Sequence, residues 1–305
     1  MNNMSVAASE LPKIFVAVAV YNRINTSLPF VQRIMKQSYD NFQLIIVDDL
    51  SNDGTYEQLV QLAKDSDKLM IIRTGGNEWW GGCMFLAVRY ILDNFHTSDS
   101  DSILFMNDDV EFEIDMLERF IKAQSQWPDS VLAGLPISEG RIHGPGSNML
   151  CWPLALTSRP HSGKLVSDKS VPEVIPIQFQ FGHGTLYPIK ILKKIGNIAK
   201  EKLPHYHGDG EFSYRAVRAG HKSLVIRDIA LYCDTKSTGR FNSMNSSQRF
   251  SDIFPSLFEF KSINNIKHRW HFAQLSAPLI WRIPYFCSQT IKSILRSVYI
   301  VAKYK

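Results

Sequence analysis

Buried-strand and helix patterns alternate four times between residues 13 and 127, and this alternation constrains the fold more than any other feature. The strand-like runs are continuous and apolar, as expected of strands buried on both faces of a sheet. They lie at 13–20, 42–49, 68–73 and 102–106. A helical pattern follows each of them, at 26–38, 51–64, 81–95 and 115–127. The alternation predicts an α/β fold with a mostly parallel sheet and helices on both faces.

Polar residues stand where three of these strands end. Tyr21-Asn22-Arg23 follows the first strand, Asp48-Asp49 closes the second, and Asn107-Asp108-Asp109 follows the fourth. Ligands of α/β sheets bind beyond the carboxyl ends of the parallel strands. We therefore expect these segments to lie along one edge of the sheet and to line a common ligand site.

The acidic pairs in these segments each admit two interpretations. Asp108 and Asp109 could hold a hard divalent cation, because such cations prefer oxygen ligands. Asp is equally common in turns and at helix starts, where it caps free backbone N–H groups. Asp48-Asp49 could accept hydrogen bonds from a nucleobase or a ribose, or could belong to the turn that continues to Asp53-Gly54.

The segment 75–84, GGNEWWGGCM, combines two glycine pairs with two adjacent tryptophans. Gly81-Gly82 at a helix start would let backbone N–H groups approach an anion, with the helix dipole in support. One of Trp79 and Trp80 could line a pocket while the other packs in the core, although both could equally be core residues.

The segment 207–215, HGDGEFSYR, places Asp209 and Glu211 at the start of a helix. Acidic residues stabilise helix N-termini, and this alone could explain them. The functional interpretation is a general base that removes a proton from an attacking hydroxyl. His183 lies between two glycines and His143 precedes one, so either could reach a substrate or be structural.

The strand–helix alternation weakens after residue 134. A short helix is expected at 188–196, and a second helix is expected to start near Asp209, end at Gly220 and return as a strand. We expect the following division of the chain: an N-terminal extension 1–12, a main domain 13–240 with halves 13–127 and 128–240, and a helical C-terminal region 241–305.

The positive charge of the chain is concentrated at its C-terminal end. The whole chain carries +5, and residues 261–305 contain eight Lys and Arg but no Asp or Glu, so residues 1–260 carry −3. Basic, aromatic and amphipathic segments of this kind suit the surface of an anionic membrane. The alternative is a pair of helices that pack on the main domain or form a dimer contact. Nucleic acid is a poor partner, since the rest of the chain is acidic.

Several classes of protein lack their signatures in this sequence. We find no Ser-His-Asp order, G-x-S-x-G elbow, P-loop or G-x-G-x-x-G, which argues against a hydrolase, a kinase or a classical dinucleotide-binding enzyme. The four cysteines are widely spaced without a CxxC pair, so we expect neither a zinc site nor a disulfide framework. We also expect no signal peptide and, without about 18 consecutive apolar residues, no membrane-spanning helix.

The order of the motifs resembles family 2 inverting glycosyltransferases of GT-A fold. The resemblance rests on VAVAVYNR, IIVDDLSNDGT, GNEWWGGCMFLAV, FMNDDVEF and HGDGEFSYRAVRAG, and it covers residues 13–235. It implies a Rossmann-like, mostly parallel sheet flanked by helices, with a basic helical C-terminal region added. Among relatives, the chain is most similar to bacterial enzymes that build lipopolysaccharide, O-antigen or other surface glycans.

The resemblance also implies roles for individual residues. Those expected at the nucleotide are Ala19, Tyr21, Asn22, Asp49 and Gly82. Those expected at the donor sugar or the acceptor are Trp80, Asn107, His183, Gly184 and Glu211. Asp108 and Asp109 would form the DxD element that holds Mn²⁺ or Mg²⁺, Asp109 more directly, and Asp209 would be the catalytic base. Cys233-Asp234 stands where many relatives have a metal-binding His.

The function implied by the resemblance is metal-assisted, inverting transfer of a sugar from a UDP- or dTDP-linked donor. The acceptor would be a hydroxyl of a glycan or a polyprenyl-linked molecule. The protein would be cytoplasmic and peripheral on the inner face of the plasma membrane, which residues 261–305 would contact. One alternative is a sugar-nucleotide nucleotidyltransferase, which should carry a glycine-rich phosphate loop after the first strand, and residues 17–27 contain no such loop. The other is a non-catalytic, membrane-associated scaffold of the same fold.

Overall fold

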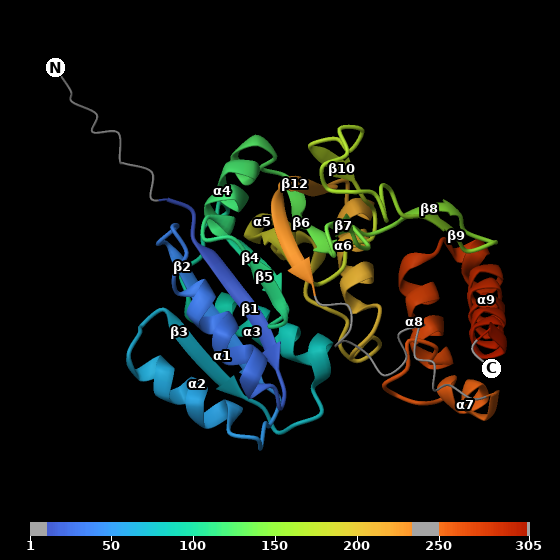
Figure 1. The fold of residues 1–305 in the computed structure, drawn as a ribbon, viewed down its shortest axis with the longest axis horizontal. Coiled ribbons are helices and arrows are strands. Elements are labelled where there is room, and N and C mark those ends of the chain that lie inside the picture. The colour runs from blue at the N-terminus through green and yellow to red at the C-terminus, as the bar shows by residue number, and fades with distance from the viewer. Residues whose placement is uncertain (1–10, 234–249, 304–305) are drawn as a thin grey trace.

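A mixed ten-stranded sheet forms the centre of the computed structural model, which describes residues 11–233 and 250–303 (Figure 1). Its order is β10-β12-β6-β11-β4-β1-β2-β3, while β5 pairs with β12 and β7 with β6. The four strands predicted in the first half are parallel neighbours: β1 (Ile14–Val20), β2 (Phe42–Asp48), β3 (Leu69–Arg73) and β4 (Ser102–Met106). The α/β class is confirmed.

Two apolar layers enclose the sheet, one on each face. Alternate side chains of β1 serve the two layers, because successive residues of a strand point to opposite faces. Val16 and Val18 pack with residues of α1, α2 and α4, whereas Phe15 and Ala17 pack with residues of α3, α5 and α6. The helices in question are α1 (Ile24–Ile34), α2 (Thr55–Lys64), α3 (Trp79–Asn94), α4 (Met116–Gln126), α5 (Ile189–Ile195) and α6 (Gly208–Arg218).

The second half of the chain extends the sheet beyond β4. β6 (Ser130–Ser138) and β12 (Lys222–Cys233) are parallel, while β11 (Gly184–Pro188) lies antiparallel between β4 and β6. The sheet is therefore mixed, where the sequence predicts a mostly parallel one. An antiparallel neighbour needs no crossover helix, and none lies between β6 and β11. The short strands are β5 (Val110–Phe112), β7 (Arg141–Ile142), β8 (Asn148–Cys151), β9 (Leu156–Ser158) and β10 (Val174–Pro176).

The C-terminal helices stand beside the sheet and pack near α6 (Figure 1). They are α7 (Phe250–Ser256), α8 (Ile266–Ser276), the short 3₁₀ helix η1 (Leu279–Trp281) and α9 (Arg282–Lys303). An aromatic cluster makes the contact: Phe179 stacks on Tyr214 with ring centroids 4.4 Å apart, and Phe272 and Tyr285 close it from α8 and α9. The expected C-terminal helical region is thus present. None of the helices described here is long and apolar enough to cross a bilayer.

The division of the chain into an extension, a two-part main domain and a C-terminal region stays a prediction. The extension lies almost wholly outside the described residues, and so does the boundary at residue 240, because residues 1–10 and 234–249 are not described. Within the described part, the helices at 250–303 are the ones that the basic C-terminal region contributes.

Gly81, in the first turn of α3, allows the segment 203–204 to approach this helix closely. Its N–H donates to the backbone oxygen of Pro204 at 2.7 Å. A Cβ atom at this position would lie 2.6 Å from the backbone oxygen of Leu203 and 2.8 Å from that of Pro204. Backbone atoms cannot move aside as the end of a side chain can. The contact therefore fixes the chain shortly before α6, which carries Asp209.

Gly81→Ala should destabilise the protein, even though Ala favours helices more than Gly does. The added methyl meets the backbone of the segment 203–204, so we expect a loss of about 1–3 kcal/mol in the free energy of unfolding, measured by chemical denaturation. Gly75→Ala is the matched control, because nothing lies within 4 Å of a Cβ atom there. Equal stability of the two variants would mean that the segment 203–204 can move away from the added methyl without a loss in the free energy of unfolding.

Candidate active site

Side chains from both halves of the chain meet at the carboxyl end of β4. Because β11 runs antiparallel to β4, its first residue, Gly184, lies opposite Met106, the last residue of β4. His183 and Asn107 consequently meet, with Nδ1 of His183 3.2 Å from Nδ2 of Asn107. The indole N–H of Trp80 donates to Oδ1 of Asn107 at 3.2 Å. Residues expected at the donor sugar or the acceptor thus lie together.

Asp209 joins this group from the first turn of α6. Its Oδ2 accepts a hydrogen bond from the N–H of Gly182 at 3.0 Å, and its Oδ1 accepts one from the N–H of Gly210 at 2.8 Å. Burial raises the pKa of Asp209, and these N–H groups and His183 offset that effect only in part. A carboxylate with a raised pKa accepts a proton more readily than an ordinary Asp does.

His183 connects Asp209 with the acidic pair after β4. Burial lowers the pKa of His183, while the charges of Asp209 and Asp109 both act to raise it. A charge has such an effect only at short range. The sequence places Asp209 and Asp109 100 residues apart. The structure brings them to the same edge of the sheet, because Gly182 donates to Asp209 while Asn107, two residues before Asp109, contacts His183.

Arg23, the last residue of the polar segment after β1, binds both members of the acidic pair. Its Nη1 lies 2.8 Å from Oδ1 of Asp108, and its Nη2 lies 2.9 Å from Oδ2 of Asp109. Ser27 donates its hydroxyl to Oδ2 of Asp108 at 2.6 Å. The side chain of Asp108 is 1% exposed. Burial raises its pKa to about 6, although Arg23 and Ser27 act in the opposite direction.

Asp109 fits a divalent cation, whereas Asp108 is held by Arg23 and Ser27, and its expected role as a second ligand stays a prediction. Oδ1 of Asp109 accepts no hydrogen bond from the described residues. Residues 11–233 and 250–303 contain no cluster of three or more His, Cys, Asp or Glu side chains suited to a metal. Mg²⁺ sites often use one or two carboxylates together with substrate phosphates. A cation here would depend on Asp109 and on the oxygens of a bound diphosphate.

Cys233, expected where many relatives have a metal-binding His, is half-buried, and its role as a metal ligand stays a prediction. Burial raises the pKa of its thiol to about 12, and the charge of Asp109 adds to this effect. Metals bind the thiolate and not the thiol. Asp234, the other half of the expected replacement, lies outside the described residues.

The residues expected at the nucleotide lie on the neighbouring ends of β1 and β2. Tyr21 is 51% exposed just beyond β1, and Ala19 is half-buried within it. Asn22 has a left-handed backbone with φ of 50°. Its Oδ1 accepts the N–H of Asn52 at 2.8 Å, which ties the loop after β1 to the loop after β2. The contact of these residues with a nucleotide stays a prediction.

Asp49 holds the start of α3 in place. Its carboxylate accepts hydrogen bonds from the N–H groups of Glu78 and Trp79, both at 3.0 Å, and from the hydroxyl of Thr74 at 2.7 Å. Trp79 has an unusual positive φ of 57°, which these bonds help to fix. These contacts lie at the start of α3 and not in the turn that continues to Asp53-Gly54, where Asp48 accepts the N–H of Ser51 at 3.0 Å. The role of Asp49 at a nucleotide stays a prediction.

The glycines of the expected site serve packing. The N–H of Gly82 donates to the backbone oxygen of Glu78 at 3.0 Å, and that of Gly81 is taken by the segment 203–204. The anion-binding interpretation of this pair must therefore be corrected, because neither N–H is available. At Gly184, a Cβ atom would lie 2.4 Å from a side-chain carbon of Leu231, so the glycine lets β11 enter the sheet.

Glu211 does not join the group at the end of β4. Both of its carboxylate oxygens are bound by the guanidinium of Arg215, one turn later in α6. Its side chain is 3% exposed. Arg215 in turn donates to the backbone oxygens of Ile195 and Asn197. Glu211 therefore anchors α6 to the end of α5, and this differs from the expected contact with a sugar.

The sequence singled out the segment Tyr21-Asn22-Arg23 but gave no role to Arg23, and its pattern predicted that the following helix starts at residue 26. Helix α1 begins earlier, at Ile24, with Arg23 as its N-cap residue. This frees the hydroxyl of Ser27 for Asp108. No local sequence signal identifies this contact. It depends on the pairing of β1 with β4, which puts a cation after one strand beside the anions after the other.

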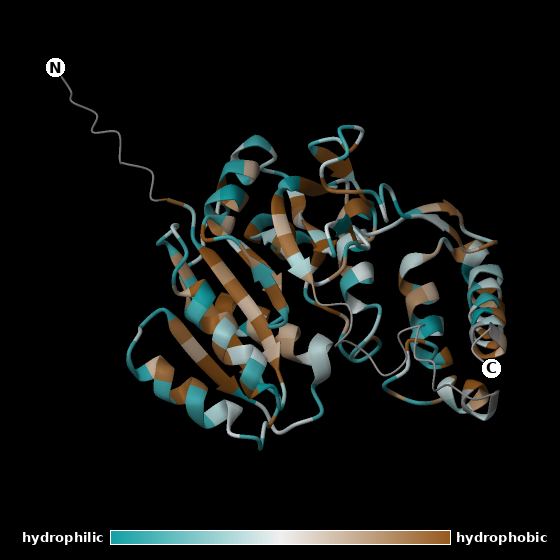
Figure 2. Cartoon of the chain, viewed as in Figure 1, coloured by the Kyte–Doolittle hydropathy of each residue, from teal (hydrophilic) through white to brown (hydrophobic). Residues whose placement is uncertain are grey.

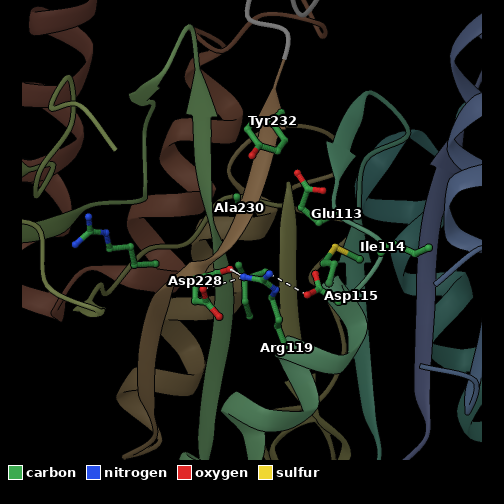
Figure 3. A pocket seen from close by; sticks show the side chains of 10 residues that line it. Glu113, Ile114, Asp115, Arg119, Asp228, Ala230 and Tyr232 are labelled. Atoms are coloured by element: carbon green, nitrogen blue, oxygen red, sulfur yellow. Dashed lines mark hydrogen bonds and ion pairs between the residues drawn. The ribbon is translucent and has the colours of Figure 1, made fainter. Parts of the chain in front are cut away.

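A cavity of about 450 Å³ lies at a different place, between β12 and the start of α4 (Figure 3). Arg119 reaches across it to Asp115 and Asp228, at 2.8 Å in each case. None of the expected site residues lines this cavity, whose walls are formed by Glu113, Ile114, Asp115, Met116, Arg119, Arg227, Asp228, Ile229, Ala230 and Tyr232. We therefore place the candidate active site at the end of β4.

Comparisons of sequence point to one family. The family model described as "Glycosyl transferase family 2" matches residues 15–196, more than half of the chain. The chain is 37% identical over 68 residues to "Putative glycosyltransferase EpsE" of Bacillus subtilis, a match that covers 22% of this chain and 24% of that protein. The chain spans about a fifth of the length of the curated relatives that it matches.

Comparisons of structure show a shared fold, that of GT-A glycosyltransferases. The "Mannosyltransferase PcManGT from Pyrobaculum calidifontis in complex with GDP-Man and Mn2+" is similar with a TM-score of 0.59 and 12% identity, over 97% of this chain and 75% of that one. S. aureus TarS 1-349 in complex with UDP-GlcNAc is similar with a TM-score of 0.54 and 16% identity, over 96% of this chain and 91% of that one.

Arg23→Met should destabilise the protein far more than Arg33→Met. The two arginine side chains are about equally exposed, 34% and 35%, but their partners differ: Asp108 is 1% exposed, and Glu111, the partner of Arg33, is 69% exposed. Loss of one partner from a buried ion pair costs about 3–5 kcal/mol, and the partial exposure of Arg23 should reduce this to about 2–3 kcal/mol. A surface pair contributes about 0–1 kcal/mol. Urea denaturation measures both, and equal losses would contradict the role given to Arg23.

Proposed function

Since the chain belongs to glycosyl transferase family 2, we propose that it transfers a sugar from a nucleotide-sugar donor to a hydroxyl group of an acceptor. The observation that carries this proposal is the arrangement at the end of β4, where Asp209 accepts the N–H of Gly182 and where Asn107, two residues before Asp109, contacts His183. One carboxylate is available for a proton and the other for the diphosphate side of the reaction. The two come from different halves of the chain.

Asp209 would act as the general base. As the acceptor oxygen bonds to the anomeric carbon, its proton passes to a carboxylate oxygen of Asp209, and the bond from that carbon to the diphosphate oxygen breaks. The raised pKa of Asp209 suits this task, and the N–H of Gly182 orients the carboxylate. Attack from the side opposite the leaving group inverts the configuration, so we propose an inverting enzyme.

Asp109 would hold Mn²⁺ or Mg²⁺ through the oxygen that Arg23 does not contact. When bound, such a cation neutralises the charge of the departing diphosphate. Arg23 fixes the other oxygen of Asp109 and brings a permanent positive charge to the same edge. The similar mannosyltransferase forms its complex with Mn²⁺, which supports a cation in this fold without deciding which ion this chain uses.

The donor and the acceptor are proposed in terms of their class. UDP- or dTDP-linked sugars are the expected donors, and the similar structures carry UDP-GlcNAc in one case and GDP-Man in the other. The acceptor would be a glycan or a polyprenyl-linked molecule in the synthesis of a bacterial surface polysaccharide such as lipopolysaccharide. The basic C-terminal region supports a cytoplasmic enzyme that is peripheral on the inner face of the plasma membrane.

Asp209→Asn should abolish transfer and leave donor binding intact. The amide oxygen can still accept the N–H of Gly182, so the fold should survive, but the amide cannot take up a proton. We expect turnover to fall by about 10²- to 10⁴-fold in a donor-consumption assay. Asp129→Asn, which changes a carboxylate that is 73% exposed, is the control.

The same assignment sets the sign of the pH dependence. The reaction needs Asp209 as the carboxylate, so the rate should fall as the pH drops through its pKa. Because burial raises that pKa, the fall should begin at a higher pH than for an ordinary Asp.

Undiminished turnover of Asp209→Asn would contradict the role of Asp209 as the general base and would favour a non-catalytic protein.

Stabilisation by donor and metal should depend on Asp109 and not on Asp108. In a thermal-shift screen of UDP- and dTDP-sugars, we expect a donor that raises the Tm more with Mn²⁺ than without it. Asp109→Asn should remove the metal-dependent part and lower the Tm of the free protein less than Asp108→Asn does, because the Asp109 side chain is 10% exposed and that of Asp108 is 1% exposed. Asp108→Asn should lower that Tm instead, because it weakens the contacts with Arg23 and Ser27. If Asp108→Asn removed the metal-dependent part and Asp109→Asn did not, Asp108 and not Asp109 would be the metal ligand.

A further inference from the structure

The outer side of η1 and α9 carries a row of exposed apolar side chains. Residues 283, 287, 291 and 295 are four positions apart, which places them on one side of a helix, and residue 280 precedes them in η1. Figure 2 shows hydrophobic and hydrophilic residues side by side on α9. We call this the outer row; its members are Ile280 (72% exposed), Ile283 (65%), the exposed Cys287, Ile291 (56%) and Leu295 (62%).

The opposite side of α9 is already packed against the protein. Tyr285 is 4% exposed and Val301 is 2% exposed. Arg269 of α8 donates to the backbone oxygen of Gln289 at 2.7 Å, and the hydroxyl of Ser288 donates to the backbone oxygen of Pro153 at 2.7 Å. Helix α9 cannot rotate to bury the outer row without giving up these contacts. The row is therefore a fixed surface feature.

Positive charge also lies on α9. Lys292 and Arg296 each follow a member of the row by one position, about 100° further round the helix, and both are exposed, while Lys292 also donates to the backbone oxygen of Ala155 at 3.2 Å. No Asp or Glu occurs in residues 261–305. Arg269, by contrast, is 9% exposed and belongs to the packing between α8 and α9. Exposed positive charge is therefore spread over the C-terminal region, on Lys261 and Lys267 as well as on Lys292 and Arg296 of α9.

We propose that this side of η1 and α9 docks on an anionic membrane surface, with the outer row in the interface and Lys292 and Arg296 at the lipid phosphates. An exposed apolar row with basic flanks is the form of helices that lie in the plane of a membrane. The 22 residues of α9 give it a length of about 33 Å along that plane. A second copy of the chain is a poorer occupant, because twofold packing brings like charges together.

Docking of α9 would set the position of the active site. Figure 1 shows α9 at the edge of the molecule, on the side of α6 and α8 and away from β1–β3. Helices α8 and α9 share an aromatic cluster with Tyr214 of α6, whose first turn carries Asp209. The base would thus be held near the surface that presents a polyprenyl-linked acceptor. Only this last step rests on the proposed function.

Vesicle sedimentation of the full chain, without donor or acceptor, tests the surface directly. The protein should bind vesicles of phosphatidylglycerol and phosphatidylcholine, and more weakly those of phosphatidylcholine alone. The double variant Ile291→Gln with Leu295→Gln should lower the partition coefficient about tenfold or more. Lys292→Gln and Arg296→Gln should each lower it about fivefold on the anionic vesicles only.

Ile114→Gln is the matched control, because Ile114 is 62% exposed, as Leu295 is, but lies beside α4. Circular dichroism and the Tm confirm that each variant is folded. Unchanged binding of the double variant would overturn the proposal, and so would equal binding to neutral and anionic vesicles. The unchanged chain could instead bind no vesicles and form a dimer that dissociates in the double variant. That result would assign the outer row to contact with a second copy of the chain. Asp209→Asn should bind vesicles like the unchanged chain, which separates this test from that of catalysis.

Discussion

The antiparallel pairing of β11 with β4 brings the two halves of the chain to one place. The register runs from Gly184 opposite Met106 to Pro188 opposite Ser102, and it puts the segment 182–183 between β4 and α6. A slip of one residue would turn every side chain of β11 to the other face of the sheet. Glycines make the register possible, because a Cβ atom at Gly182 would lie 2.6 Å from the indole of Trp80.

The charges at this edge depend on one another. Two adjacent carboxylates in a poorly solvated place would resist simultaneous ionisation, and the guanidinium of Arg23 lies against both of them. Asp108 is the buried member that secures Arg23, and Asp109 is the member that can present a charged oxygen. Asp108 and Asp109 thus have different roles, which explains why two acidic residues and an arginine occur together here. A single metal ligand would need only one carboxylate.

The first half of the fold could be predicted because its strands are continuous apolar runs and its helices follow them at regular intervals. β11 could not, since residues 177–188 show no clear period and the direction of a strand depends on neighbours that the local sequence does not name. The same limit applies to Arg23 and Asp109, which are 86 residues apart. At Gly81-Gly82, the sequence indicated a close approach of the backbone to an anion. In the structure, the backbone of Gly81 instead approaches the protein's own segment 203–204. The role of Asp209 came from the resemblance, because composition and spacing alone allow a helix cap.

The outer row also contains a sulfur atom. The four thiols of this chain differ in access: Cys83 is buried, Cys151 and Cys233 are intermediate, and Cys287 is exposed. Burial raises the pKa of Cys83 and of Cys233, which makes both slow to react with electrophiles. A thiol-directed fluorophore should therefore react first at Cys287, in the first half of α9. A polarity-sensitive dye can therefore be attached to the unaltered chain at Cys287. It would report whether the outer row is in contact with water or with lipid.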